Sequence, residues 1–453
     1  MADLPAALRA AVPGLTVLDD PDVMDAYRRD QAPGLPAGRP AAVVMPEDTA
    51  QVAAAVATAA AHGAPIVVRG AGSGLAGAAN AVDGCLILST QRMNRILAVD
   101  PAERLATVQP GVINADLRQA VAAQGLFYPP DPGSYEMCTV GGNAATNAGG
   151  MCCVKYGVTG DYVRGLEAVL ADGSVLRTGR RTVKGVAGYD LTHLLVGSEG
   201  TLAVITELTL ALRPAPMQPR TIIGQFATTA AAGAAVTEVL ASAADPSILE
   251  IIDATTLRAI EAWQPLGVEA DTAAMVIAQS DSARQDEDLR LIEAAFHEAT
   301  EVIVADDAAE SEMLMQARRL AYPALERLGA TLLDDVAVPL PELVALIEGV
   351  EAIAAGHGMT VGIFGHAGDG NMHPTVVYPH GDAEAEKLAF TVFDEIVALA
   401  LRLGGTVTGE HGVGLLKRSW LDRELDETAR RTQRAVKAAL DPAGLLNPGK
   451  AIA

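Results

Sequence analysis

The stretch Arg69-Gly70-Ala71-Gly72-Ser73-Gly74-Leu75-Ala76-Gly77 decides how this chain folds. It follows a short apolar run typical of a buried strand and contains the spacing G-x-G-x-x-G. In a Rossmann unit this loop would open a helix, and an acidic residue would end the next strand. Residues 78–84 are too few and too rich in turn formers for that helix, and the next strand ends in Ser89-Thr90. The lysine of a P-loop is absent as well.

Two interpretations of this loop remain, an ordinary glycine-rich turn and a cradle whose backbone N–H groups face a pyrophosphate. A second stretch, Thr139–Gly150, favours the cradle because it contains four glycines among small polar residues. Such a segment is expected to let the backbone approach a large flat ligand closely. A rigid turn at Pro129–Ser134 precedes it, and Gly197–Leu202 repeats the small-residue pattern.

The elements around these loops predict an α+β chain. Asp48, with Gln51 three residues later, predicts the start of a helix that ends near Gly63. Strands are expected at 66–69, 85–88, 106–109, 166–170 and 201–212, with a hairpin turn at 171–174. The prolines of residues 213–216 predict a domain boundary. Beyond it, a strand at 221–225, a helix at 229–243 and further alternation suggest a ferredoxin-like domain, and 428–440 predicts a terminal helix.

Bulk properties exclude some classes of function. A chain of 453 residues is expected to form two or three domains. Its net charge of -23 argues against nucleic-acid binding, which needs a clustered basic face. The four cysteines, Cys85, Cys138, Cys152 and Cys153, have no C-x-x-C spacing and are expected to be reduced. Residues 1–13 lack a signal-peptide core, and we expect a soluble cytoplasmic protein without a membrane span.

Three of the eight histidines lie in two glycine-rich stretches near the C-terminus. The first runs from His366 to His373 and reads HAGDGNMH, and the second is Gly409-Glu410-His411-Gly412. Two imidazoles and a carboxylate form a common ligand set for a divalent metal, and a third imidazole could serve as a general base. The alternative is that the histidines only form hydrogen bonds within turns.

Taken together, these motifs resemble the PCMH-type FAD-binding fold of the vanillyl-alcohol oxidase superfamily. The second half resembles the FAD-linked oxidase C-terminal domain of the group with the glycolate oxidase flavin subunit, D-lactate dehydrogenase and D-2-hydroxyglutarate dehydrogenase. The matching motifs follow one another from about Arg39 to Lys450. The resemblance implies an FAD domain of two α+β subdomains (1–215), a ferredoxin-like α+β substrate domain (216–405) and a C-terminal segment with a helical tail that returns to the FAD (406–453).

The resemblance also implies where FAD would bind. The loop Arg69–Gly77 would hold the pyrophosphate, and two later segments would line the rest of the cofactor. Ser73 stands where some relatives carry a histidine that binds flavin covalently, so we expect noncovalent FAD. The expected contacts are Arg69, Gly70, Ala71, Gly72, Ser73, Gly74, Leu75, Pro129, Thr139, Gly142, Asn143, Thr146, Gly200, Val204, Ile205 and Asn447.

By the same resemblance, His366, His373 and Glu410 would hold a divalent metal and His411 would be the base. Zinc is the expected ion, although iron and manganese suit the same ligands. A metal on the substrate oxygen lowers the pKa of a hydroxyl, so that a histidine can take its proton near neutral pH. The implied reaction is oxidation of a 2-hydroxy acid to the 2-keto acid, with hydride passing from Cα to flavin N5.

A substrate carboxylate requires a guanidinium partner, and Arg318 stands where relatives place one. Arg319 is its rival, and either could instead be a solvated helix charge. Tyr322 and Asn371 are expected near the substrate, while Asp369 is expected to shape the turn. Some relatives that oxidise dicarboxylates have a lysine shortly before the segment 335–339, where this chain has Thr331-Leu332-Leu333-Asp334. That difference favours a small monocarboxylate of glycolate or D-lactate type, although Lys417 could still supply charge.

Several alternatives stay open at this point. The enzyme could be a D-2-hydroxyglutarate dehydrogenase, a metal-free flavin alcohol or amine oxidase, or a flavin subunit active only in a complex. No cysteine-rich iron–sulfur extension is seen before Ala453, so electrons are expected to pass to a quinone, an electron-transfer protein or a partner subunit. A homodimer or a hetero-complex is compatible with this, as is peripheral attachment to the inner membrane through a partner.

Overall fold

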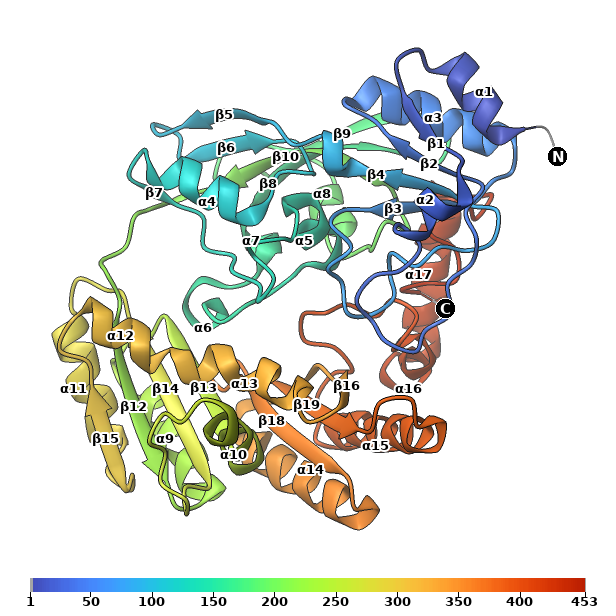
Figure 1. Ribbon diagram of the computed structural model, residues 1–453. Coiled ribbons are helices and arrows are strands. Elements are labelled where there is room, and N and C mark those ends of the chain that lie inside the picture. The colour runs from blue at the N-terminus through green and yellow to red at the C-terminus, as the bar shows by residue number, and fades with distance from the viewer. Residues whose placement is uncertain (1–2, 453) are drawn as a thin grey trace. The chain divides into compact units, whose positions relative to one another are not determined.

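The computed structural model describes residues 3–452, which divide into two compact units. Unit 1 contains residues up to Gly149, Val158–Ala215 and Glu410 onward, and unit 2 contains Gly150–Gly157 and Pro216–Gly409. The chain therefore crosses between units within the proline cluster, and its last part, from Glu410, belongs to unit 1. Figure 1 labels the elements of both units.

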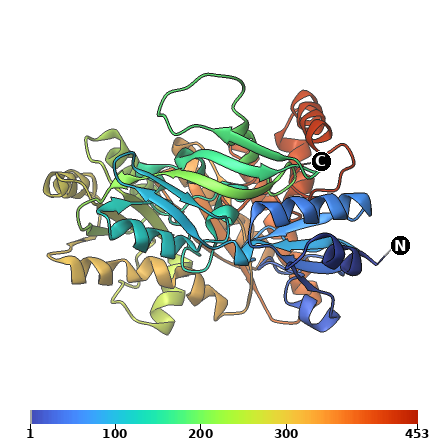
Figure 2. The same ribbon diagram turned by 90° about the horizontal axis from the view of Figure 1, so that it is seen from above.

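Unit 1 contains two main sheets. The first has the order β1-β2-β4-β3, in which β2 runs parallel to β4 and β4 parallel to β3. The second, order β5-β6-β10-β8-β9, is antiparallel and appears from above in Figure 2. The strands are β1 (Thr16–Leu18), β2 (Ala42–Met45), β3 (Ile66–Arg69), β4 (Leu86–Ser89), β5 (Ile96–Asp100), β6 (Leu105–Val108), β8 (Val163–Val169), β9 (Val175–Gly179), β10 (Val204–Ala211), and the separate pair β7 (Leu126–Phe127) and β11 (Arg213–Pro214).

The core of unit 1 forms where helix α3 (Thr49–Ala61) packs between the two sheets. Val52 and Val56 of this helix lie in one apolar cluster with Ile66 of β3 and Val204 of β10. The predicted cap is confirmed, because Asp48 accepts a hydrogen bond from the Gln51 amide at 2.9 Å. The other helices are α1 (Leu4–Ala11), α2 (Pro21–Asp25), α4 (Asn114–Ala122), α5 (Val140–Thr146), α7 (Thr159–Tyr162), α8 (Leu191–Leu195), α16 (Leu421–Glu424) and α17 (Glu427–Leu440).

Unit 2 is built on one eight-stranded sheet of order β15-β12-β14-β13-β18-β19-β16, with β17 paired to β19. The order of β12 to β15 is that of a ferredoxin-like module, which confirms the predicted class for this region. The strands are β12 (Arg220–Phe226), β13 (Ile248–Asp253), β14 (Ala274–Ser280), β15 (Glu301–Val304), β16 (Ala330–Leu333), β17 (Val336–Ala337), β18 (Thr360–His366) and β19 (Asn371–Tyr378).

Helices cover both faces of this sheet (Figure 1). Helices α10 and α13 pack together on one face over β13 and β18, while α9 and α14 pack together on the other. Because side chains alternate along a strand, each face of the central strands has its own environment. The helices are α6 (Cys153–Tyr156), α9 (Thr229–Ala241), α10 (Ala254–Trp263), α11 (Gln285–Ala295), α12 (Ala308–Leu314), α13 (Gln316–Glu326), α14 (Leu343–His357) and α15 (Ala383–Arg402).

Candidate functional site

The glycine-rich loop of unit 1 presents a row of backbone amides. It leaves the end of β3 beside the end of the parallel strand β4, and Gly72 and Gly77 take positive φ values of 74° and 78°. Across residues 3–452, no amide from Gly70 to Ala76 donates to a protein acceptor. Consecutive N–H groups that the protein leaves without an acceptor form a natural site for an anion such as a pyrophosphate. The loop therefore fits the phosphate part of a dinucleotide.

Two polar side chains near this loop are also suited to a ligand. The Ser89 hydroxyl lies at the end of β4, and the Asn447 side chain bridges Ala78 O and Glu199 O through Nδ2. Ser89 Oγ and Asn447 Oδ1 are both buried, and neither has a hydrogen-bond partner within residues 3–452. Buried polar atoms are rarely left without a partner, so these atoms are suited to hydrogen bonding with a bound cofactor.

The second glycine stretch is more ordered than its composition suggests. Thr139 caps helix α5 by accepting the Gly142 amide at 3.2 Å, and Thr146 Oγ1 donates to Gly142 O within the helix. A Cβ on Gly141 would lie 2.4 Å from Pro110, so this glycine serves helix packing. The segment also contributes to the core of unit 1, because Val140, Asn143 and Ala144 are buried.

The remaining predicted cofactor residues also lie in unit 1. A Cβ on Gly70 would lie 2.5 Å from Thr139 Oγ1, so the loop and the start of α5 are neighbours. Gly200, with φ of 71°, lies against Val68 of β3 and precedes the buried pair Val204 and Ile205 on β10. Pro129 is buried after β7.

Glu199 anchors the start of the C-terminal segment within unit 1. Its buried carboxylate accepts the amides of Val413 at 2.7 Å and Gly414 at 2.8 Å. Burial raises the pKa of Glu199 to about 7, against the effect of those two amides and of Lys450. Burial likewise lowers the pKa of Lys450 to about 8. Sequence reasoning gave no role to Glu199 or Lys450.

In unit 2, the hairpin of β18 and β19 brings His366 and His373 together. The Nε2 atoms of the two rings lie 3.3 Å apart, and the ring planes are nearly perpendicular at 86°. Two imidazole nitrogens bound to one tetrahedral zinc at about 2.0–2.1 Å lie about 3.3 Å apart. Both side chains are buried. The pair therefore fits two corners of a metal site.

Glu250 of β13 lies beside His366 on the same sheet face. Ile251 pairs with Gly365 and Ile252 with Phe364, and the next step in that register places Glu250 opposite His366. Glu250 Oε1 lies 2.6 Å from His366 Nδ1, and Glu250 Oε2 pairs with Nε of Arg318 on α13. Burial alone would raise the pKa of Glu250, but the charges of His366 and Arg318 and their hydrogen bonds hold it below its usual value.

The structure separates the two candidate arginines. The Arg318 side chain is 12% exposed and its guanidinium lies 4.9 Å from the centre of the Phe364 ring. Arg319 instead pairs with Glu312 at 2.5 Å on the surface. The helical spacing could have shown this, because Arg318 lies on the same stripe as the buried Ala321 and Leu325 of α13. Tyr322 forms a hydrogen bond of 3.1 Å to Thr331 Oγ1.

Asp335 is a second buried carboxylate of unit 2 that sequence reasoning missed. Its Oδ1 accepts Asn371 Nδ2 at 2.8 Å and lies 3.9 Å from His373 Nδ1. Its Oδ2 accepts the Thr408 hydroxyl at 2.6 Å and the Gly409 amide at 3.1 Å. The Asn371 amide group, expected near the substrate, is thus held by Asp335 and Val336 O.

Glu410 and His411 follow Gly409 directly and begin the last part of unit 1. Glu410 Oε1 and His411 Nε2 lie 3.9 Å apart, and both side chains are largely buried. Gly409 is the last residue of unit 2, and its amide is hydrogen-bonded to Asp335. Asp369 accepts the Asn371 amide at 3.2 Å and so shapes the turn, while Lys417 is buried in unit 1.

Comparison with two family models shows which protein family this chain matches. Residues 215–451 match the family described as FAD linked oxidases, C-terminal domain, and residues 40–179 match an FAD binding domain. The chain belongs to the FAD-linked oxidase family. The PCMH-type recognition and the α+β fold predicted from the sequence are thereby confirmed. This FAD-linked oxidase is an oxidoreductase that uses FAD.

Several relatives resemble this FAD-linked oxidase over nearly their full length. The glycolate oxidase subunit GlcD of Bacillus subtilis is 41% identical over 91% of this chain and 89% of its own. A D-lactate dehydrogenase of Archaeoglobus fulgidus is 36% identical over 94% of this chain and 96% of its own. An uncharacterized FAD-linked oxidoreductase of Mycobacterium tuberculosis is 38% identical over 99% of both chains.

Solved structures share the fold of this FAD-linked oxidase at low identity. A 4-ethylphenol oxidase from Gulosibacter chungangensis has a TM-score of 0.81 at 20% identity and covers 100% of this chain and 97% of its own. An alkyldihydroxyacetonephosphate synthase has a TM-score of 0.80 at 20% identity, covering 99% and 86%. Within residues 3–452, every helix is too short or too polar to cross a lipid bilayer.

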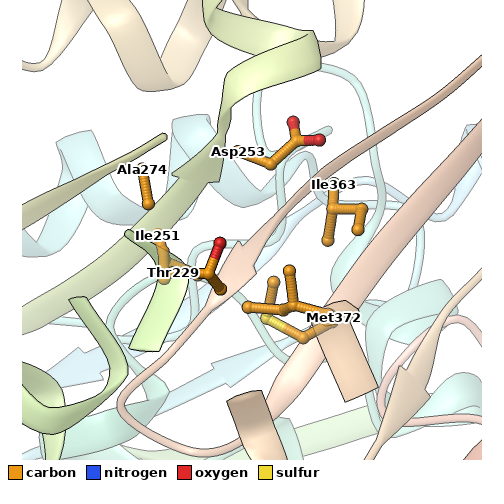
Figure 3. Close-up of a pocket in the computed structure, with 7 residues that line it drawn as sticks. Thr229, Ile251, Asp253, Ala274, Ile363 and Met372 are labelled. Carbon is orange, nitrogen blue, oxygen red and sulfur yellow. The ribbon is translucent and has the colours of Figure 1, made fainter. Parts of the chain in front are cut away.

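A narrow crevice in unit 2 lies on the opposite face of the sheet from the histidines. Figure 3 shows Ile251, Ile363 and Met372 around it, with the Asp253 carboxylate at the end of β13. Ile251 and Met372 are strand neighbours of Glu250 and His373, so their side chains point to the other face. The crevice has no room for a water-sized sphere, and it is not the candidate site.

Proposed function

We propose that this FAD-linked oxidase oxidises a small 2-hydroxy acid of glycolate or D-lactate type to the 2-keto acid. Glycolate and D-lactate are named for relatives that match most of this chain. The observation that carries the proposal is the His366–His373 pair, whose ring nitrogens lie 3.3 Å apart and which is linked to Arg318 through Glu250. A cation site next to a guanidinium suits a substrate with a hydroxyl and a carboxylate on neighbouring carbons.

Different residues of the chain have different roles in the proposed reaction. His366, His373 and Glu410 would hold a divalent metal, zinc by preference, and the loop Arg69–Gly77 would hold noncovalent FAD. When bound, the metal would polarise the hydroxyl and FAD would accept hydride at N5. Arg318 binds the substrate carboxylate through its guanidinium, and His411 takes the hydroxyl proton. Within unit 2, Asp335 holds Thr408 and Gly409 through hydrogen bonds.

A dye-linked activity screen tests the proposal. The FAD-containing protein is assayed with glycolate, both lactates and both 2-hydroxyglutarates, before and after treatment with EDTA. We expect turnover of glycolate or D-lactate that EDTA abolishes and added Zn²⁺ restores. Turnover that survives EDTA in protein free of metal would overturn the metal role and favour a metal-free oxidase.

The other outcomes separate the alternatives. Activity confined to D-2-hydroxyglutarate would replace the proposed substrate. A yellow protein that reduces no dye with any acid would indicate a flavin subunit that needs partners, as the word subunit in the name of the glycolate oxidase relatives suggests. The electron acceptor would then be a partner subunit, and otherwise a quinone or an electron-transfer protein.

A further inference from the structure

The Glu250 carboxylate lies fully buried in the middle of the unit 2 sheet and uses both of its oxygens. Oε1 lies 2.6 Å from His366 Nδ1, and Oε2 is paired with Arg318 Nε. An ionised carboxylate inside a protein is strongly destabilising unless it is paired with a cation and hydrogen-bonded. Here the same carboxylate meets both conditions with two different side chains, which thereby become linked through it.

The contact with His366 determines which ring nitrogen of that histidine can bind a metal. In the neutral ring, which is the form that binds a metal, a proton on Nδ1 is donated to the carboxylate and Nε2 keeps its lone pair. Nε2 is the atom that faces His373 Nε2 at 3.3 Å. Glu250 thus selects the tautomer in which His366 points an acceptor toward the candidate metal position.

The contact with Arg318 leaves part of its guanidinium available. Glu250 engages Nε, and the group lies over the Phe364 ring at 4.9 Å from its centre. Within residues 3–452, neither Nη1 nor Nη2 of Arg318 donates to a protein acceptor. Two parallel N–H groups of a guanidinium match the two oxygens of a carboxylate. The orientation of that fork is fixed by the same residue that orients His366.

We propose that Glu250 is a positioning residue that sets the distance between the metal site and the carboxylate-binding guanidinium. The inference rests on the proposed function and specifies its substrate geometry. In a 2-hydroxy acid, the hydroxyl and the carboxylate sit on adjacent carbons, so their separation is fixed by the substrate. One rigid carboxylate that holds both binding groups keeps them at that separation, and favours 2-hydroxy acids over 3-hydroxy acids.

The test compares two binding measurements on FAD-loaded variants. Zn²⁺ affinity is measured by calorimetry, and pyruvate affinity at saturating Zn²⁺ by the change in flavin absorbance. Glu250→Gln keeps the size of the side chain but offers one acceptor and one donor, so it cannot accept from both partners. We expect both affinities to fall about tenfold or more. Arg318→Lys should weaken pyruvate alone, and His366→Ala should weaken Zn²⁺.

Asp253→Asn is the matched control, because Asp253 is a buried carboxylate of the same strand that faces the other side of the sheet and caps α10. It should change neither affinity by more than about twofold, as expected for a residue that touches neither binding group. The inference alone would be overturned if Glu250→Gln keeps both affinities within threefold of the wild type while His366→Ala loses Zn²⁺ binding. If His366→Ala keeps full Zn²⁺ affinity, the proposed metal site itself fails.

A measurement on the unmutated protein keeps the inference testable if the Glu250 variants do not fold. Nitrogen-15 NMR of labelled histidine distinguishes the two neutral tautomers of each ring. We expect His366 in the metal-free holoprotein to carry its proton on Nδ1. A proton on Nε2 instead would contradict the positioning role, whatever the outcome of the activity screen.

Discussion

The two units build their candidate binding sites from different parts of the chain. The loop of unit 1 offers backbone amides from one continuous stretch, Gly70 to Ala76. The site of unit 2 offers side chains from three strands and a helix, and Glu250 and His366 are 116 positions apart in the chain. A backbone site can therefore be recognised in a local motif, whereas a side-chain site exists only once distant strands have paired.

The two sites also differ in what maintains their geometry. In the loop, glycines at positive φ let the chain turn sharply, so the geometry depends on the absence of side chains. In the sheet, Glu250 compensates its own burial by pairing with His366 and Arg318, so the geometry depends on charge. Substitutions in the two places should therefore damage different ligands.

The largest effect is expected for His373→Ala. The variant removes one of two ring nitrogens at the candidate metal position, and loss of a polarising metal should lower kcat by about a thousandfold or more. FAD should stay bound at full occupancy, because the loop of unit 1 is untouched. Metal analysis measures the bound metal, flavin absorbance measures the bound FAD, and dye-linked kinetics measure kcat. His380→Ala, an exposed histidine just beyond β19, is the control and should leave them unchanged. Loss of flavin in His373→Ala would contradict the independence of the two sites.

Gly72→Ala is expected to weaken FAD binding instead of metal binding. Gly72 has φ of 74°, and a Cβ there would lie 2.1 Å from Nη2 of the buried Arg69. Strain of about 1–2 kcal/mol from the backbone alone should weaken FAD about tenfold, and the clash should add to this. Zn²⁺ affinity should not change. Gly63→Ala is the control, because Gly63 also has a positive φ, of 61°, but lies outside the loop and has nothing within 4 Å of its Cβ position. Equal loss of FAD in both variants would show that FAD binding does not depend specifically on the backbone conformation of this loop.

Much of the fold could be predicted because its signals are local. The Asp48 cap and the turn at Gly173 each depend on a few neighbouring residues. The histidines were also visible, since His366 and His373 lie on one hairpin. Glu250 and Asp335 could not be found in this way, because their roles depend on the pairing of β13 with β18 and of β17 with β19. An isolated acidic residue within an apolar strand was the available signal for Glu250.

The glycines of Thr139–Gly150 show where composition misleads. Four glycines predicted close approach of the backbone to a large flat ligand, yet Gly141 lies against Pro110 inside a short helix. Glycine permits both an exposed turn and close packing between elements, and the sequence alone does not separate the two. The distinction depends on what lies opposite, and Pro110 is 31 positions away in the chain.

A smaller effect is expected in how the stability contributions of the two buried glutamates, Glu199 and Glu250, depend on pH. The pKa of Glu199 is raised to about 7 by burial, so its protonated form is favoured in the fold, whereas the pKa of Glu250 lies below its usual value. A raised folded-state pKa contributes stability at pH below about 4.5 that is lost as pH rises through about 7. Relative to Glu199→Gln, the wild type should therefore lose up to about 3 kcal/mol of unfolding free energy between pH 4.5 and 7.

Glu250 should behave in the opposite way. Its lowered pKa contributes stability above about 4.5 that is lost only as pH falls further, so the titration of Glu250 itself should add no slope to the difference between wild type and Glu250→Gln from pH 5 to 7.5. Thermal unfolding of the three holoproteins, followed by circular dichroism across that range, measures both slopes. Lys450 and Asp30 face Glu199 and remain in every variant, so their titration cancels to first order in the comparison. If the stability difference between wild type and Glu199→Gln does not change with pH, the Val413 and Gly414 amides hold the Glu199 carboxylate ionised. Glu199 would then be ionised in the fold across this pH range, as Glu250 is.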